Sequence, residues 1–125
     1  MTVLLIVVAG GIGAATRFVV DGLVRARHDH ALPVATILVN TTGSGLLGLL
    51  SGGLLFHGLA SAVYAVVGVG FCGGYTTFST SMVETVRLLQ SGDRRRAVLN
   101  VVGSTLLALG AAALGVAVMW GVGQL

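Results

Sequence analysis

The chain has 125 residues, of which 55% are hydrophobic and only 9% are charged, and its mean hydropathy is +1.00. A soluble domain normally carries about 25% charged residues. The composition therefore excludes a soluble globular domain and indicates an integral membrane protein. The net charge of +3 could suggest nucleic-acid binding, but every basic residue is an arginine, and the arginines flank the apolar segments instead of forming one binding face.

Long apolar segments with few charges predict an all-α membrane protein with four transmembrane helices in one domain, residues 1–125. The run from Ala31 to Val83 contains no Asp, Glu, Lys or Arg, and it is too long for one span of about 20 residues but fits two. The segment before Arg17 lacks the basic residues that begin a signal peptide, so we interpret it as a retained helix. The predicted spans are residues 3–24, 33–55, 60–89 and 97–120.

The arginines are distributed unevenly between the two ends of the predicted bundle. With four spans, the loop after the first helix (residues 25–30) and the loop after the third (residues 93–96) lie at the same end. Together these loops hold the arginines at positions 25, 27, 94, 95 and 96, whereas the opposite loop and the two termini hold none. The positive-inside rule then places both arginine-rich loops in the cytoplasm and both termini outside.

Small residues dominate one face of the first span, which contains GGIGAATRF at residues 10–18. Gly10, Gly13 and Ala14 would let another helix approach closely. Arg17 lies at the cytoplasmic boundary of this span, and two interpretations of it stay open. It pairs with Asp21 one turn later, or it draws anions toward a vestibule.

The second span begins at Pro33 and places Asn40 about 12 Å along its axis, by the rise of a helix, out of reach of either interface. An amide at that depth needs a partner inside the protein. It either makes an interhelical hydrogen bond or donates to a permeating anion. Ser44, Gly48 and Gly52 follow at i+4 spacing and predict a face for helix packing.

The third span contains GFCGGYTTFSTS at residues 70–81, near its middle. Gly73 and Gly74 can adopt backbone geometries that other residues avoid, so we predict that the third helix is broken there. A break leaves backbone carbonyls and N–H groups that hydrocarbon does not tolerate unless protein, water or an ion satisfies them. The hydroxyls of this segment can instead bond back to helix carbonyls, so a kink and an ion site both stay open.

The fourth span places Asn100 and Ser104 one turn apart, with Ala108 next in line. This short polar track is typical of a vestibule or of a hydrogen-bonded helix pair. We expect no pair of carboxylates inside the membrane, because Asp21, Asp29 and Asp93 lie in or near the cytoplasmic loops. Glu84 is spaced to pair with Arg87 at i+3. No nucleophile has a base and an orienting group, so we predict that the protein is not an enzyme.

The polar groups within the spans are mostly uncharged donors, namely an amide, several hydroxyls and the positive ring edge of Phe78. A small, strongly hydrated anion must exchange its water for such donors, and a fixed cation would hold it too tightly for release. A proton-coupled exporter would instead need an ionisable carboxylate in mid-span, and the first two spans lack one. These features favour an anion path.

Three segments together resemble the Fluc family of bacterial fluoride channels: GGIGAATRF at 10–18, ATILVN ending at Asn40, and GFCGGYTTFST at 70–80. The resemblance covers essentially the whole chain. It implies small proteins that assemble as antiparallel dimers in the cell membrane, with two narrow fluoride pores and a structural sodium ion at the dimer centre. It also implies passive release of fluoride that enters the cell as HF, which protects against fluoride toxicity.

The resemblance assigns roles to individual positions of this chain. It implies that the backbone carbonyls of Gly73 and Thr76 from each subunit hold the sodium ion. It places Arg17 near the vestibule. The residues that it assigns to the fluoride pore are Asn40, Phe78, Ser79, Thr80 and Ser104, together with Ser81, which stands where the family usually has a second phenylalanine.

The chain departs from the family pattern at Ser81 and at Asn100, where a tyrosine is usual. Both changes fall on the proposed pore. A homodimeric member must insert in both orientations, whereas the arginine bias of this chain favours one, and some family members form heterodimers of oppositely oriented homologues. We therefore hypothesise that this chain forms either a homodimer or one half of a heterodimer. Two alternatives to a conducting subunit stay open, a non-conducting subunit of such a heterodimer and a small dual-topology drug exporter that depends on Glu84.

Overall fold

The computed structural model describes residues 1–27 and 32–124 as a bundle of long helices, and this part of the chain contains no β-strand. Four stretches are long and apolar enough to cross a membrane, which confirms the predicted four spans. They are Thr2–Arg27, Val34–Phe56, Ser61–Gln90 and Arg94–Val122. The histidines and the aspartate at positions 28–30, which we expected in a cytoplasmic loop, lie outside the described residues.

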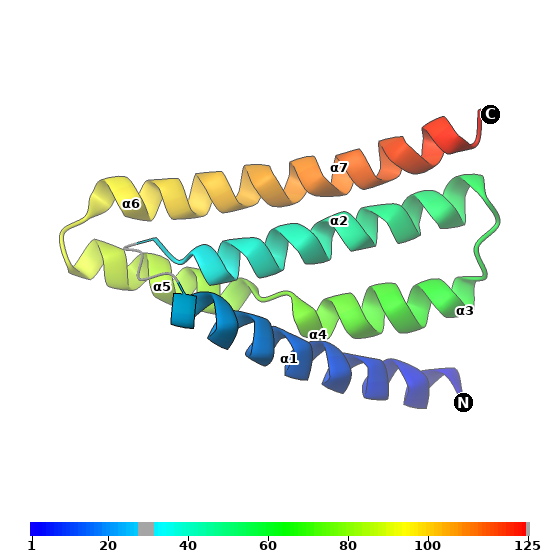
Figure 1. Ribbon diagram of the computed structural model, residues 1–125, viewed down its shortest axis with the longest axis horizontal. Helices are drawn as coiled ribbons and strands as arrows, with labels where there is room; N and C mark the ends of the chain where they lie inside the picture. The colour runs from blue at the N-terminus through cyan, green and yellow to red at the C-terminus, as the bar shows by residue number, and fades with distance from the viewer. Residues whose placement is uncertain (28–31, 125) are drawn as a thin grey trace.

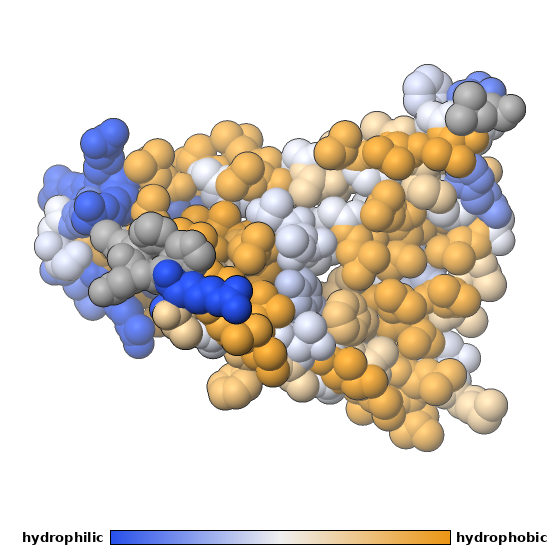
Figure 2. Space-filling model, in the orientation of Figure 1, coloured by the Kyte–Doolittle hydropathy of each residue, from blue (hydrophilic) through white to orange (hydrophobic). Residues whose placement is uncertain are grey.

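The third and fourth spans are each composed of several consecutive helical segments, and some of these have the wider turns of a π-helix. The elements in chain order are α1 (Thr2–Arg27), α2 (Val34–Phe56), α3 (Ser61–Val63), the π-helical η1 (Tyr64–Cys72), α4 (Gly73–Tyr75), α5 (Phe78–Gln90), α6 (Arg94–Val98), the π-helical η2 (Leu99–Gly103) and α7 (Ser104–Val122). Figure 1 shows both termini at the same end of the bundle as the α2–α3 connection, and the turn between α5 and α6 at the other end. Figure 2 shows hydrophilic residues gathered at that second end, where Arg94, Arg95 and Arg96 are exposed.

Backbone-to-backbone packing joins the helices, because glycines occupy the contact positions. An added Cβ at Gly48 of α2 would collide with the carbonyl oxygen of Ala112 on α7, and one at Gly52 would lie 2.6 Å from the Cβ of Met119. On α1, an added Cβ at Gly13 would collide with the carbonyl oxygen of Phe71. The predicted packing faces of the first and second spans are thereby confirmed.

The burial pattern is the reverse of that of a soluble domain. Large apolar side chains cover the outside, and the most buried side chains include Thr36, Ser81 and Asn100, which are 2%, 4% and 0% exposed. Figure 2 shows apolar residues over much of the visible face. Because lipid solvates apolar groups and leaves polar groups unsatisfied, this arrangement suits a bundle with a hydrocarbon surface and a polar interior.

Two residues of the third span are extended instead of helical. Thr76 has φ −79° and ψ 160°, and Thr77 has φ −149° and ψ 120°, between the end of α4 and the start of α5. Gly73 and Gly74 are themselves helical, so the expectation that these glycines supply a special backbone geometry is wrong. Gly74 is required for packing, because an added Cβ there would collide with the carbonyl oxygen of Gly10 on α1.

Candidate functional site

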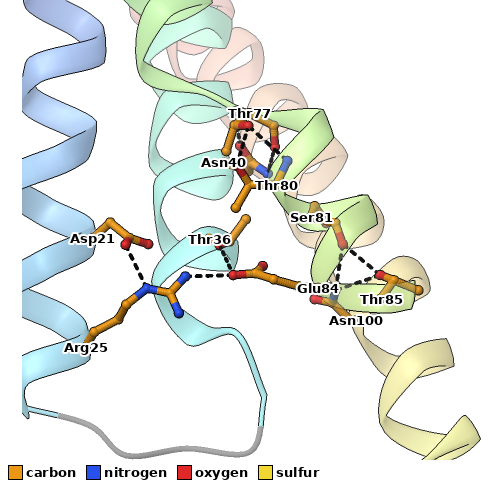
Figure 3. A network of polar contacts seen from close by, with 10 residues as sticks. All are labelled: Asp21, Arg25, Thr36, Asn40, Thr77, Thr80, Ser81, Glu84, Thr85 and Asn100. Atoms are coloured by element: carbon orange, nitrogen blue, oxygen red, sulfur yellow. Dashed lines mark hydrogen bonds and ion pairs between the residues drawn. The ribbon is translucent and has the colours of Figure 1, made fainter. Parts of the chain in front are cut away.

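Asn40 holds the extended segment of the third span with both ends of its amide. Its Nδ2 donates to the carbonyl oxygen of Thr77 at 2.8 Å, and its Oδ1 accepts from the backbone N–H of Thr77 at 2.7 Å (Figure 3). The amide thus replaces helix hydrogen bonds that the extended residues cannot make. Because an amide nitrogen carries two protons, one N–H of Asn40 is left to donate elsewhere.

Thr77 also begins α5 as its N-cap residue. Its Oγ1 accepts from the backbone N–H of Thr80 at 3.3 Å and donates to the Oγ1 of Thr80 at 3.0 Å. The hydroxyl of Thr80 acts as an acceptor in this contact, so its own proton can be donated to another group. Ser79 is exposed, and its Oγ lies 3.4 Å from the Oγ1 of Thr77.

These bonds leave two backbone carbonyls without their usual helix partners. The N–H of Thr77 would serve the carbonyl of Gly73 in a continuous helix, but it donates to Asn40. The N–H of Thr80 would serve the carbonyl of Thr76, but it donates to the Thr77 hydroxyl. Among the described residues, the Thr76 carbonyl accepts from Nη1 of Arg17 at 3.4 Å. Oxygen atoms of this kind are the ligands that hard cations prefer.

A groove of about 610 Å³ runs along this region, which we call the main groove. It is lined by residues from α2, the third span and α7. The predicted site residues that line it are Asn40, Gly73, Thr76, Phe78, Ser81 and Ser104. Phe78 is 78% exposed, so its ring projects away from its own subunit. The structure therefore brings most of the predicted pore residues to one surface.

Two other predicted residues, Arg17 and Thr80, line a second, smaller cavity of about 190 Å³, which we call the hydroxyl pocket. Thr36 and Thr77 also line it. Arg17 donates to the third span instead of pairing with Asp21, which accepts from Arg25, so the proposed Arg17–Asp21 pair is wrong. Ser79 lines neither the hydroxyl pocket nor the main groove.

Asn100 is completely buried and binds within the subunit. Its Nδ2 donates to the Oγ1 of Thr85 at 2.8 Å and to the carbonyl oxygen of Ser81 at 3.3 Å (Figure 3). Of its two open interpretations, the interhelical hydrogen bond is the one observed. Ser104 does line the main groove, but its hydroxyl donates to the carbonyl of Asn100 one turn earlier. To donate to an anion, the Ser104 hydroxyl must rotate away from that carbonyl.

A charged network at the arginine-rich end was missed by sequence reasoning. Arg25 donates to Asp21 and to Glu84, with both nitrogen-to-oxygen distances 2.7 Å, and Glu84 also accepts from Thr36 at 3.0 Å (Figure 3). The expected pair of Glu84 with Arg87 is therefore wrong. The Arg25–Asp21 spacing of i,i+4 could have been read from the sequence, but no local signal joins Glu84 to residues on α1 and α2.

The fold and the groove define a class of protein. This is a small multi-pass membrane protein whose apolar helices carry a groove lined by amide and hydroxyl groups. The family described as "CrcB-like protein, Camphor Resistance (CrcB)" matches residues 4–116, and the chain belongs to this family. It is 49% identical over 115 residues, 92% of this chain and 84% of the relative, to the fluoride-specific ion channel FluC 1 of Leifsonia xyli subsp. xyli.

Two further relatives carry similar names. The chain is 43% identical to the fluoride-specific ion channel FluC 1 of Frankia casuarinae, covering 97% of this chain and 100% of the relative. It is 41% identical to the fluoride-specific ion channel FluC 2 of Cutibacterium acnes, covering 94% of this chain and 96% of the relative. These relatives are named as channels and not as enzymes, in agreement with the prediction from the sequence.

Proposed function

We propose that this protein is a fluoride channel that lets fluoride leave the cytoplasm passively and so protects against fluoride toxicity. The observation that carries the proposal is the main groove, in which uncharged donors line a surface within membrane-length helices. The names of the relatives support fluoride as the ion. A small anion can exchange its water for these donors and still leave, because no basic side chain lines the main groove in the described part of the chain.

The donors have distinct roles in this proposal. Asn40 offers its second amide N–H, Thr80 offers its hydroxyl proton, and Phe78 offers its positive ring edge. The hydroxyls of Ser79, Ser81 and Ser104 donate as the ion passes. The guanidinium of Arg17 lines the hydroxyl pocket, where it attracts anions toward these groups.

The functional unit in this proposal is an antiparallel dimer. The main groove lies open along one subunit, and a channel needs a closed wall around its ion. Phe78 is 78% exposed, and a side chain of this type at a subunit surface suits burial against a second copy or a homologue. The opposite wall then comes from the partner, and the interruption at Thr76 and Thr77 lies at the contact.

A sodium ion at the dimer centre fits the donor set. The carbonyls of Gly73 and Thr76 lack helix partners because the N–H groups of Thr77 and Thr80 donate to side chains. Two such carbonyls from each subunit would give an all-oxygen site for a hard cation. Arg17 donates to the Thr76 carbonyl at 3.4 Å, which is a long contact, and the second lone pair of this oxygen stays available to the ion.

Fluoride efflux from liposomes containing this chain alone tests the proposal. Rapid efflux measured with a fluoride electrode, with negligible efflux of chloride from matched liposomes, would establish a channel formed by this chain alone. Efflux would also show that Ser81 can stand where a phenylalanine is usual. A folded chain that is silent alone but conducts when co-expressed with a homologous subunit would identify a heterodimer. Silence in both preparations would contradict the proposed function and favour a non-conducting subunit.

The orientation in the membrane is a separate expectation. Five arginines at one end favour insertion with that end in the cytoplasm and both termini outside. In a Cys72→Ala background, a cysteine placed at Thr2 should react fully with an impermeant reagent added outside intact cells, and one placed at Gln90 should not react. Equal half-labelling of both positions would show dual insertion and would favour a homodimer over a heterodimer.

No feature of the described residues favours the drug exporter. Such a protein needs an ionisable carboxylate in mid-span. Glu84 lies at the arginine-rich end and is paired with Arg25. Its charge is therefore matched by a fixed cation, away from mid-span.

A further inference from the structure

We propose that Arg25 is a positioning residue that sets the charge seen by fluoride at the arginine-rich end of the subunit. The inference rests on the proposed fluoride-channel function and extends it to a residue outside the main groove and the hydroxyl pocket. It concerns the network that joins Arg25, Asp21, Glu84 and Thr36 in Figure 3.

The network ties three helices together at one arginine. Nε of Arg25 on α1 donates to Oδ2 of Asp21 on the same helix, and Nη2 donates to Oε1 of Glu84 on α5. The same Oε1 accepts from Oγ1 of Thr36 on α2. The guanidinium is thus held in one position by two carboxylates, and its planar group of donors suits this double contact.

This network lies between two cavities. Arg25 and Glu84 line a cavity of about 320 Å³ at the arginine-rich end, whereas Asp21 and Thr36 line the hydroxyl pocket of about 190 Å³. The Arg25–Asp21 hydrogen bond and the Thr36–Glu84 hydrogen bond therefore each join a residue of one cavity to a residue of the other. In this proposal, an anion that moves from the arginine-rich end to Thr80 passes beside these charges.

Arg25 is the cation that pairs with both carboxylates around this passage. Asp21 and Glu84 are negative, and Arg17, Arg25 and the exposed Arg87 are positive, but among the described residues only Arg25 forms an ion pair with either carboxylate. The Glu84 side chain is only 12% exposed, and its Oε2 is buried with no hydrogen-bond partner among the described residues. Water screens such a carboxylate poorly. Without Arg25 these two carboxylates lose the cation that pairs with them, and their negative charge repels fluoride.

The test is fluoride efflux from liposomes by Arg25→Gln, in the preparation in which the unmodified chain conducts. We expect about tenfold slower efflux at low ionic strength, and a smaller deficit when an impermeant salt screens the carboxylates. Adding Glu84→Gln to Arg25→Gln should restore most of the efflux, because it removes the carboxylate that Arg25→Gln leaves unpaired. Arg25→Lys loses the planar pair of donors but keeps the charge that the inference depends on, so its efflux should stay within about twofold of the unmodified chain.

Arg27→Gln is the matched control, because it removes the same charge from an exposed position at the same helix end. We expect little change in its efflux. A purely structural role for Arg25 predicts a loss that salt does not reduce and that Glu84→Gln does not rescue. That result, or efflux by Arg25→Gln equal to that of the unmodified chain, would overturn the inference alone. An unmodified chain that never conducts would overturn the proposed function as well.

Discussion

Replacement of Asn40 by Asp is expected to slow fluoride efflux by about 100-fold or more, because a fixed negative charge in a poorly screened site repels an anion strongly. The change also removes the N–H groups of the amide. The bond from Nδ2 to the carbonyl of Thr77, 2.8 Å long, becomes a contact between two oxygens. Both the ion path and the extended segment are affected, and efflux from liposomes measures the result.

Asn40→Leu is the control that separates charge from hydrogen bonding. It removes the contacts with Thr77 but adds no charge, so we expect a smaller loss of efflux than with Asp. Size-exclusion chromatography of each purified variant shows whether the bundle is still folded. A well-folded Asn40→Asp protein with normal efflux would remove Asn40 from the ion path.

The number and type of the helices could be predicted because charged residues mark where the apolar segments end. The first helix extends to Arg27, three residues beyond the predicted end, and the last begins at Arg94, three residues before the predicted start. Arginine side chains have long apolar stems that can lie along a helix while the charge reaches water. The helices therefore continue through the basic residues, which a boundary drawn from hydropathy excludes.

The residues of the main groove could be named from one local motif, but their bonding could not. Asn40 and Thr77 come from different helices, so the two hydrogen bonds that join them depend on how α2 packs against the third span. The same reason explains why Arg25 and Glu84 were missed as a pair. Residues that meet only through packing leave no periodic signal in the sequence.

Glycine was interpreted correctly where it permits packing and incorrectly where it was expected to interrupt a helix. At Gly13 and Gly48, a missing side chain allows two backbones to approach. At Gly73 and Gly74, the same residue type was expected to adopt unusual geometry, yet both are helical, and the extended residues are threonines held by side-chain bonds. Composition alone does not separate these two uses of glycine.

Replacement of Gly74 by Ala is expected to prevent the normal packing of the first helix against the third. The added Cβ would collide with the carbonyl oxygen of Gly10 and lie 2.9 Å from its carbonyl carbon, and backbone cannot rotate away as a side chain can. Overpacking of this kind costs about 1–3 kcal/mol in other cores. We expect a lower thermal midpoint in detergent and strongly reduced fluoride efflux.

The neighbouring Gly73→Ala tests a different surface. Among the described residues, no atom beyond the neighbouring residues and backbone of its own helix lies within 4 Å of an added Cβ, and Gly73 is helical, so the isolated subunit should keep its fold. Gly103→Ala, which is equally open and helical, is the control. If Gly73 lies at a dimer centre, Gly73→Ala should weaken dimerisation in a cross-linking assay while Gly103→Ala does not. Normal dimers and normal efflux from Gly73→Ala would remove Gly73 from the contact, because a close approach of two backbones leaves no room for the methyl group.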